Sequence, residues 1–269
     1  MTGEQDGVSR AGAGDGILGQ SAVLAVAALI VVVLLGTVVV VAGLLTRRPP
    51  DSAPGLAQPV TAPAPVDAAA RARWAETVSA RTGIPARAVA AYGDAEVGAR
   101  DAWADCGITW TTLAGLGRVE PNHGRFGGAS LGEDGRPEPP VLGVALDGTS
   151  GNREVRDTDG GRLDGDPSYD RAVGPLQFIP TTWAVVGVDA DGDGRSDPQD
   201  IDDAAASAAS YLCAGTSGEA ERDVRRGDDW RSAALSYNRS TSYVERVHAE
   251  AVGYATAGPP AGPGAGPQR

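Results

Sequence analysis

The pattern of apolar and polar positions begins with a long uncharged stretch. Residues 17–45 carry no charged side chain, and most of these positions are apolar. At about 1.5 Å per helical residue, about 20 residues cross the hydrocarbon core of a bilayer, so this stretch is long enough to span one. It exceeds the apolar core of a signal peptide, which is about 7–15 residues, and Arg47 and Arg48 follow it directly. We therefore expect an uncleaved, single-pass membrane anchor.

The charges that flank this stretch leave its orientation open. Arg10 lies before it, and Arg47 and Arg48 lie after it. Taken alone, the preference for positive charge on the cytoplasmic side would place the larger, C-terminal part inside the cell. The substrate and the cysteines considered below favour the opposite orientation, with residues 1–16 as a cytoplasmic tail.

Composition sets the bounds of the folded part. Residues 46–66 are rich in Pro and Ala, a composition typical of a semi-rigid spacer that packs no core. Residues 257–269 are almost entirely Gly, Pro and Ala, and we expect them to be disordered. The sequence therefore predicts one folded domain over 67–256.

Within this domain the apolar residues recur mainly with the period of an α-helix. Asp67 is suited to cap the first helix, and Pro85 is suited to begin the second. Further helices are expected over 108–120, 181–186, 203–213, 229–237 and 241–255. Residues 126–170 hold many Gly, Asp and Pro residues, which predicts a long loop region with a short hairpin around 141–146. The predicted fold class is mainly α, with long irregular loops.

Charge and residue types exclude several classes of function. The chain has 35 acidic residues against 23 basic ones, which argues against sequence-independent binding of nucleic acid. The only histidines are His123 and His248, too few for a zinc enzyme, and neither forms a plausible pair with a Ser or Cys nucleophile. We interpret His123 as a residue that fixes a loop and His248 as a surface residue. No organic cofactor is expected.

Glu120 is the candidate catalytic residue that the helical pattern offers. Trp110, Leu113, Gly117 and Glu120 are spaced i, i+3, i+7 and i+10, so they fall on one apolar face. Pro121 disfavours the α conformation of the residue before it, so the helix should end there. Burial and the negative end of the helix dipole both raise the pKa of a carboxyl group, and a carboxyl that stays protonated near neutrality can protonate a glycosidic oxygen. The alternative is a helix-terminal Glu that turns to solvent.

Three sequence blocks together resemble a known family. Residues 119–125 read VEPNHGR, residues 168–183 read SYDRAVGPLQFIPTTW, and residues 234–238 read ALSYN, followed by Tyr243 and Val244. In this order they resemble the catalytic motif, the glutamine-phenylalanine segment and the tyrosine-asparagine segment of the membrane-bound lytic murein transglycosylase B family. The resemblance covers most of 70–250. One departure is Pro121, where the family more often carries a serine or another small polar residue.

The resemblance implies a lysozyme-like fold and cleavage of peptidoglycan between N-acetylmuramic acid and N-acetylglucosamine. Glu120 would then act as the single acid and base, and the muramoyl 6-hydroxyl would attack C1 to leave a 1,6-anhydro end. Such intramolecular attack needs no second carboxylate, unlike ordinary glycosidases. Two alternatives stay open: a muramidase that uses the same acid but admits water, and a non-catalytic module that binds peptidoglycan.

The same resemblance implies a set of substrate-binding residues. Ser168 and Tyr169 would line the cleft, and Gln177 would bond the sugar. Tyr237 and Asn238 would hold the muramoyl ring or orient Glu120. For Gln177 and Tyr237 the alternative is buried packing with a satisfied polar tip.

Residues 189–200 match the twelve-residue EF-hand loop, with Gly194 at the sharp turn. The expected ligands of a structural Ca²⁺ ion are Asp189, Asp191, Asp193, Arg195 through its backbone carbonyl, Asp197 and Asp200. The last position carries Asp in place of the usual Glu, which shortens the ligand arm. Some members of the resembled family carry a calcium loop at this point. The alternative is a solvated acidic turn.

Cys106 and Cys213 are the only cysteines. Outside the cytoplasm, two cysteines favour one disulfide, whereas inside it they favour free thiols. Because murein lies outside the cytoplasmic membrane, we expect the disulfide and an extracytoplasmic domain; two buried free thiols are the alternative. The expected partners are peptidoglycan strands and the membrane, with no nucleic acid, while any partners in cell-wall synthesis or division stay open.

Overall fold

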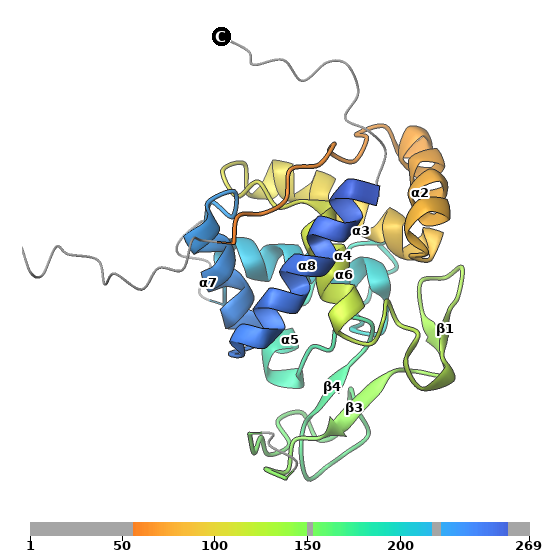
Figure 1. The fold of residues 1–269 in the computed structure, drawn as a ribbon. Coiled ribbons are helices and arrows are strands. Elements are labelled where there is room, and N and C mark those ends of the chain that lie inside the picture. The colour runs from red at the N-terminus through yellow and green to blue at the C-terminus, as the bar shows by residue number, and fades with distance from the viewer. Residues whose placement is uncertain (1–55, 150–152, 217–221, 258–269) are drawn as a thin grey trace, which may run out of the picture. The chain divides into compact units, whose positions relative to one another are not determined.

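The computed structural model describes residues 56–149, 153–216 and 222–257 (Figure 1). The predicted anchor over 17–45 lies outside these residues. Within them, no helix is both long and apolar enough to cross a membrane.

The described chain is mainly helical, as the periodicity predicted. Its seven helices are α2 (Ala68–Thr82), α3 (Ala86–Ala102), α4 (Trp110–Val119), α5 (Pro180–Val186), α6 (Ile201–Ala214), α7 (Gly227–Tyr237) and α8 (Thr241–Ala257). Every helix expected from the sequence is present, and the ends for which residue ranges were expected are displaced by two residues or fewer. Helix α6 begins at Ile201, earlier than the expected 203, because Asp200 is its cap. Asp67 caps α2 as expected, since its side chain accepts a hydrogen bond from the Ala70 amide.

The strands are short: β1, β2 and β3 lie in the predicted loop region, and β4 directly follows it. β1 (Ser130–Leu131) pairs with β2 (Pro137–Glu138), and β3 (Leu142–Ala145) pairs antiparallel with β4 (Arg171–Val173). The hairpin expected around 141–146 is therefore wrong: a strand is present there, but its partner is the distant β4. The apolar pattern located the strand, whereas the partner depends on how the intervening loop folds back. Figure 1 shows β3 and β4 side by side below the helices.

Helix α4 lies at the centre of the core. Every residue from Trp110 to Gly117 is buried, so the helix has no face left for solvent along that length. Helix α8 packs closely against it, because a side-chain carbon added at Gly115 would lie 2.6 Å from the Val247 carbonyl oxygen. Glycine at position 115 therefore permits the close crossing of α4 and α8 visible in Figure 1.

Residues 56–66, the last part of the predicted spacer, lie on the domain. The Gln58 side chain donates to the Gly107 carbonyl at 2.8 Å and accepts from the Thr109 amide at 3.1 Å. Ala62 accepts a hydrogen bond from the Trp110 indole at 3.2 Å, and Ala64 is buried. The expectation was a semi-rigid spacer that packs no core, but residues 56–66 contact the domain and bury Ala64. Composition did not reveal these polar contacts, which Gln58 and the Trp110 indole provide.

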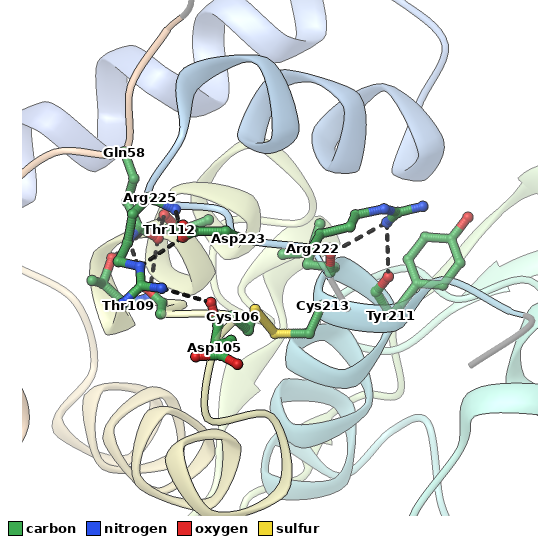
Figure 2. Close-up of a disulfide and its surroundings, with 12 residues drawn as sticks. Gln58, Asp105, Cys106, Thr109, Thr112, Tyr211, Cys213, Arg222, Asp223 and Arg225 are labelled. Atoms are coloured by element: carbon green, nitrogen blue, oxygen red, sulfur yellow. Dashed lines mark hydrogen bonds and ion pairs between the residues drawn. A yellow bond between two sulfur atoms is a disulfide. The ribbon is translucent and has the colours of Figure 1, made fainter. Parts of the chain in front are cut away.

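The expected disulfide joins Cys106 to Cys213, with 5.5 Å between their Cα atoms (Figure 2). It links the segment before α4 to the end of α6. The chain after α6 reinforces this link, because the Arg222 amide donates to the Cys213 carbonyl at 2.7 Å and the Val224 amide donates to the Cys106 carbonyl at 2.9 Å.

Removal of the disulfide should destabilise the domain without changing its fold. The cysteines are 107 residues apart, and closing a loop of about 100 residues is worth up to about 4.7 kcal/mol in the chain-entropy description. We predict that changing both Cys106 and Cys213 to Ala lowers the free energy of unfolding by about 2–5 kcal/mol, measured by urea denaturation. The reduced wild type is the matched control. Equal midpoints for the oxidised wild type and the variant would contradict this assignment.

Candidate active site

Glu120 directly follows α4 and forms its C-terminal cap. Its amide donates to the Leu116 carbonyl at 2.9 Å, and its side chain is half-buried. From α8, the Tyr243 hydroxyl donates to Glu120 Oε1 at 2.7 Å. Burial raises the pKa of Glu120 to about 7, although the hydrogen bond from Tyr243 and the charge of Arg246 act in the opposite direction. At neutral pH the Glu120 carboxyl is therefore protonated in about half of the molecules.

A second buried carboxylate fixes the start of α4. The side chain of the cap residue Thr109 accepts no hydrogen bond from an amide of this helix. Instead, Glu96 Oε2 on α3 accepts from the Trp110 amide at 2.9 Å, and the same side chain pairs with Arg100. A carboxylate at a helix N-terminus satisfies a free amide and favours the helix dipole. The helix that ends at Glu120 is thereby held at its opposite end.

The turn after Glu120 has an unusual backbone. Asn122 and His123 both adopt the left-handed region, at φ 54° and 58°, which costs about 1–3 kcal/mol for each residue other than Gly. The buried His123 ring compensates, because the Tyr92 hydroxyl lies 3.0 Å from its Nδ1 and the Tyr254 hydroxyl lies 3.1 Å from its Nε2. Burial lowers the pKa of His123 to about 3, so the ring is neutral. His123 thus fixes the turn that carries Glu120.

Three of the predicted substrate-binding residues meet at one cavity of about 470 Å³. Gln177, Tyr237 and Asn238 line it, together with Phe178, Tyr211 and residues of the loop before β4. The Gln177 side-chain nitrogen donates to the Gly174 carbonyl at 2.9 Å, which leaves its oxygen as the atom available to a ligand.

Tyr237 lines this cavity, whereas Glu120 does not. The Tyr237 hydroxyl donates to the Leu176 carbonyl at 2.7 Å, and its ring packs edge-on against Phe178 and Tyr211. Burial and then the charge of Glu120 raise the pKa of Tyr237, so its ring lies within electrostatic reach of the catalytic candidate. The hydrogen bond to Glu120, however, comes from Tyr243. Tyr243 belongs to the third sequence block, which could have identified it, whereas nothing in the sequence singled out Tyr92 or Tyr254.

Ser168 and Tyr169, which we expected in the cleft, do not line this cavity. The Ser168 carbonyl accepts from the Asp157 amide at 3.1 Å, and its own amide donates to Asp166 at 3.0 Å. The Tyr169 ring lies beneath the Arg156 guanidinium, 4.6 Å from ring centre to Cζ. Both residues therefore stabilise the loop before β4, which forms one side of the cavity.

The aspartate loop brings together a different ligand set from the predicted one. Carboxylate oxygens of Asp189, Asp191 and Asp203 lie within 4.8 Å of one another. Asp203 is fully buried and accepts from the amides of Ala190 at 2.6 Å and Asp197 at 2.8 Å. Oxygen donors of this kind suit Ca²⁺, so these three side chains fit a hard cation. Asp203 was missed because it lies three residues beyond the EF-hand pattern.

The other predicted carboxylates face a guanidinium group. Arg136 lies 3.1 Å from Asp193, 3.4 Å from Asp197 and 3.2 Å from Asp200. Asp200 is also committed to α6, because its Oδ1 accepts from the Asp202 amide at 2.9 Å. The backbone carbonyl of Arg195 was expected as a further ligand; the amide of the same residue donates to the Asp193 side chain at 2.8 Å. Of the predicted carboxylate ligands, Asp189 and Asp191 thus lie with Asp203, whereas the other three lie against Arg136.

Comparison with known proteins adds one family match. Residues 155–225 match the family model described as Transglycosylase SLT domain. The match supports a peptidoglycan lytic transglycosylase or lysozyme-like family for this chain, and it includes Gln177 and the aspartate loop but not Glu120. No curated protein and no solved structure matches the chain.

The hydrogen bond from Tyr243 should set the pH range of activity. If protonated Glu120 is the active form, activity is full below its pKa of about 7 and is lost as the pH rises through that value. Tyr243→Phe removes an interaction that lowers this pKa, so the alkaline limb of peptidoglycan cleavage should move to higher pH. Glu120→Gln is the control without a titrating acid. An unchanged limb, or one displaced to lower pH, would contradict this role of Tyr243.

Proposed function

We propose that the protein is a lytic murein transglycosylase with Glu120 as its single general acid and base. The observation that carries this proposal is the partly buried carboxyl of Glu120, whose pKa burial raises to about 7, within electrostatic reach of the cavity residue Tyr237. The family match over 155–225 supports the same class of enzyme. The bond cleaved would be the β-1,4 bond between N-acetylmuramic acid and N-acetylglucosamine.

In the proposed reaction, the proton moves out from Glu120 and back to it. Protonated Glu120 donates to the glycosidic oxygen as its bond to C1 of the muramoyl residue breaks. The muramoyl 6-hydroxyl then attacks C1, and its proton returns to the Glu120 carboxylate. The products are a 1,6-anhydromuramoyl end and a free 4-hydroxyl on N-acetylglucosamine, with no water consumed.

The surroundings of Glu120 agree with a single acid. Within the described part of the chain, the groups that shift its pKa are Tyr243 and Arg246, and neither is a carboxylate. A glycosidase that uses a nucleophile or an activated water needs a second carboxyl about 5–9.5 Å away. Attack by the substrate's own hydroxyl removes that need.

The cavity supplies groups that could hold the sugar. The free oxygen of Gln177 can accept a hydroxyl or acetamide proton, and the exposed Asn238 side chain can bond from the α7 end. Tyr237 would act through packing, since its hydroxyl is already bonded to Leu176.

Product analysis tests this function directly. The full chain and a Glu120→Gln variant are incubated with purified peptidoglycan, and the released fragments are identified by mass spectrometry. We expect anhydromuramoyl ends from the wild type and a loss of at least about 100-fold in their release from the variant. Reducing muramoyl ends would instead indicate a muramidase. If neither protein released fragments, the result would contradict the enzyme and favour a non-catalytic module that binds peptidoglycan.

We propose in addition that Ca²⁺ binds to the aspartate loop through Asp189, Asp191 and Asp203. Their convergence supports this choice, as does the repulsion that raises the pKa of Asp203: after burial, the causes include the charges of Asp191 and Asp189. A bound cation would tie the segment after α5 to α6, a structural role.

The calcium proposal predicts a thermal shift that depends on Asp203. At a Ca²⁺ concentration 100-fold above Kd, binding stabilises the folded chain by about 2.7 kcal/mol, which raises Tm by several degrees. Asp203→Asn should abolish the difference in Tm between Ca²⁺ and chelator, whereas Asp200→Asn, the matched control, should retain it. If Asp200→Asn lost the Ca²⁺-dependent rise in Tm and Asp203→Asn kept it, the result would contradict this ligand set and favour the EF-hand ligands expected from the sequence.

We also infer that the domain works outside the cytoplasmic membrane, held by an anchor over 17–45. The disulfide between Cys106 and Cys213 supports an oxidising compartment. Peptidoglycan, the substrate class that the family match implies, lies in that compartment.

A further inference from the structure

The cavity beside Tyr237 has an unusual charge for this protein. Two arginines, Arg153 and Arg239, line it, and none of its lining residues is acidic. The whole chain carries 35 acidic residues against 23 basic ones, so a cavity with only positive charge runs against its composition.

Arg153 and Arg239 also differ from most arginines of the domain in their pairing. Arg156 and Arg171, which lie near β3 and β4, form ion pairs with Glu154 and Asp166 at 2.7 and 2.8 Å. Among the described residues, neither Arg153 nor Arg239 has an acidic partner within ion-pair distance. Both side chains are exposed and are therefore available to a ligand.

The two arginines come from distant parts of the chain. Arg153 precedes the bridge between Arg156 and Tyr169, in the loop that follows β3. Arg239 directly follows Asn238, in the connection between α7 and α8. Fold topology, and not local sequence, thus places both guanidinium groups at the cavity that contains Gln177 and Tyr237.

We propose that Arg153 and Arg239 form a subsite for a carboxylate of the glycan substrate. A guanidinium group matches a carboxylate in shape and charge, with two parallel N–H donors for two oxygens. This inference rests on the proposed function, because it assigns part of the same site. The site would accordingly select an acidic glycan over a neutral polymer of N-acetylglucosamine.

Peptidoglycan offers such a carboxylate from two sources. Where a stem peptide is attached, the lactyl group of muramic acid is a neutral amide and the carboxylates belong to the peptide. Where the peptide has been removed, the lactyl group itself carries the negative charge. Either source presents the same chemical group to the arginines, so the experiment must separate them.

Arg153 and Arg239 can be changed with little effect on the acid. The charged side chain that acts on the pKa of Glu120 is Arg246, and neither cavity arginine is among the groups that shift this pKa. Their loss should therefore weaken binding while the pH dependence of the reaction stays unchanged. An effect transmitted through Glu120 would displace the pH profile.

Binding measurements on the full chain with Glu120→Gln, which should not turn over substrate, test the subsite. The probes are glycan strands with stem peptides, the same strands after amidase treatment, and a neutral N-acetylglucosamine oligomer. Changing both Arg153 and Arg239 to Gln should raise Kd about three- to tenfold for at least one of the two acidic glycans and leave Kd for the neutral oligomer unchanged. Changing both to Lys should recover only part of the affinity, because an ammonium group keeps the charge but lacks the two parallel donors. Arg73→Gln, at an exposed arginine on α2, is the control for loss of positive charge elsewhere.

The outcomes separate the source of the carboxylate from the proposal itself. An effect confined to peptide-bearing strands assigns the stem peptide, and an effect confined to amidase-treated strands assigns the lactyl group. Equal loss for the neutral oligomer, no loss for either acidic glycan, or no binding of any glycan would overturn the subsite. Mass spectrometry of wild-type products runs in parallel: arginine-dependent binding without product would retain the subsite and refute the transglycosylase.

Discussion

Burial of α4 along its length is the constraint on which the rest of the structure depends. Because Trp110 to Gly117 have no solvent-facing side, the polar groups at both ends of this helix must find partners within the protein. Glu96 meets the first amide, and Tyr243 meets the carboxyl that follows the last turn. Burial in the core thus has two consequences: it requires partners for the polar groups at the ends of α4, and it raises the pKa of Glu120.

Aspartate side chains give order to the long loop region between β3 and α6. Asp157 accepts from the amides of Gly160 and Gly161, and the buried Asp170 accepts from both the amide and the hydroxyl of Thr158. Such bonds from short acidic side chains to nearby amides replace a regular backbone ladder. They allow a segment with few apolar residues to form a defined wall of the cavity that contains Gln177.

The sequence predicted much of the helical fold because most helix boundaries are local features. Asp67 caps α2 and Pro85 directly precedes α3, and both effects depend on the neighbouring few residues. The apolar face through Leu113 and Gly117 likewise placed Glu120 at a buried helix end. The partner of β3 and the packing of Gln58 were not predictable in this way, since they join segments far apart in the chain.

The candidate site shows the same division. The sequence blocks identified Gln177, Tyr237 and Asn238, which the fold brings to one cavity. The hydrogen-bond partners of Glu120 and of His123 were harder to predict from the sequence. Tyr243 and Tyr254 lie more than 100 positions from these residues, and each contributes only its hydroxyl group to the hydrogen bond. In the aspartate loop, the spacing of the acidic residues could not show that Arg136, from a distant part of the chain, would form an ion pair with Asp200.

The pKa of Glu120 itself is the most direct test of this account. Carbon-13 NMR of the full chain, with labelled Glu carboxyl groups and Glu120→Gln for assignment, follows that single titration. We predict a midpoint near 7, about 2.5 units above the ordinary value of 4.5. A midpoint at the ordinary value would show that water reaches the carboxyl, and it would contradict the assignment of Glu120 as the acid.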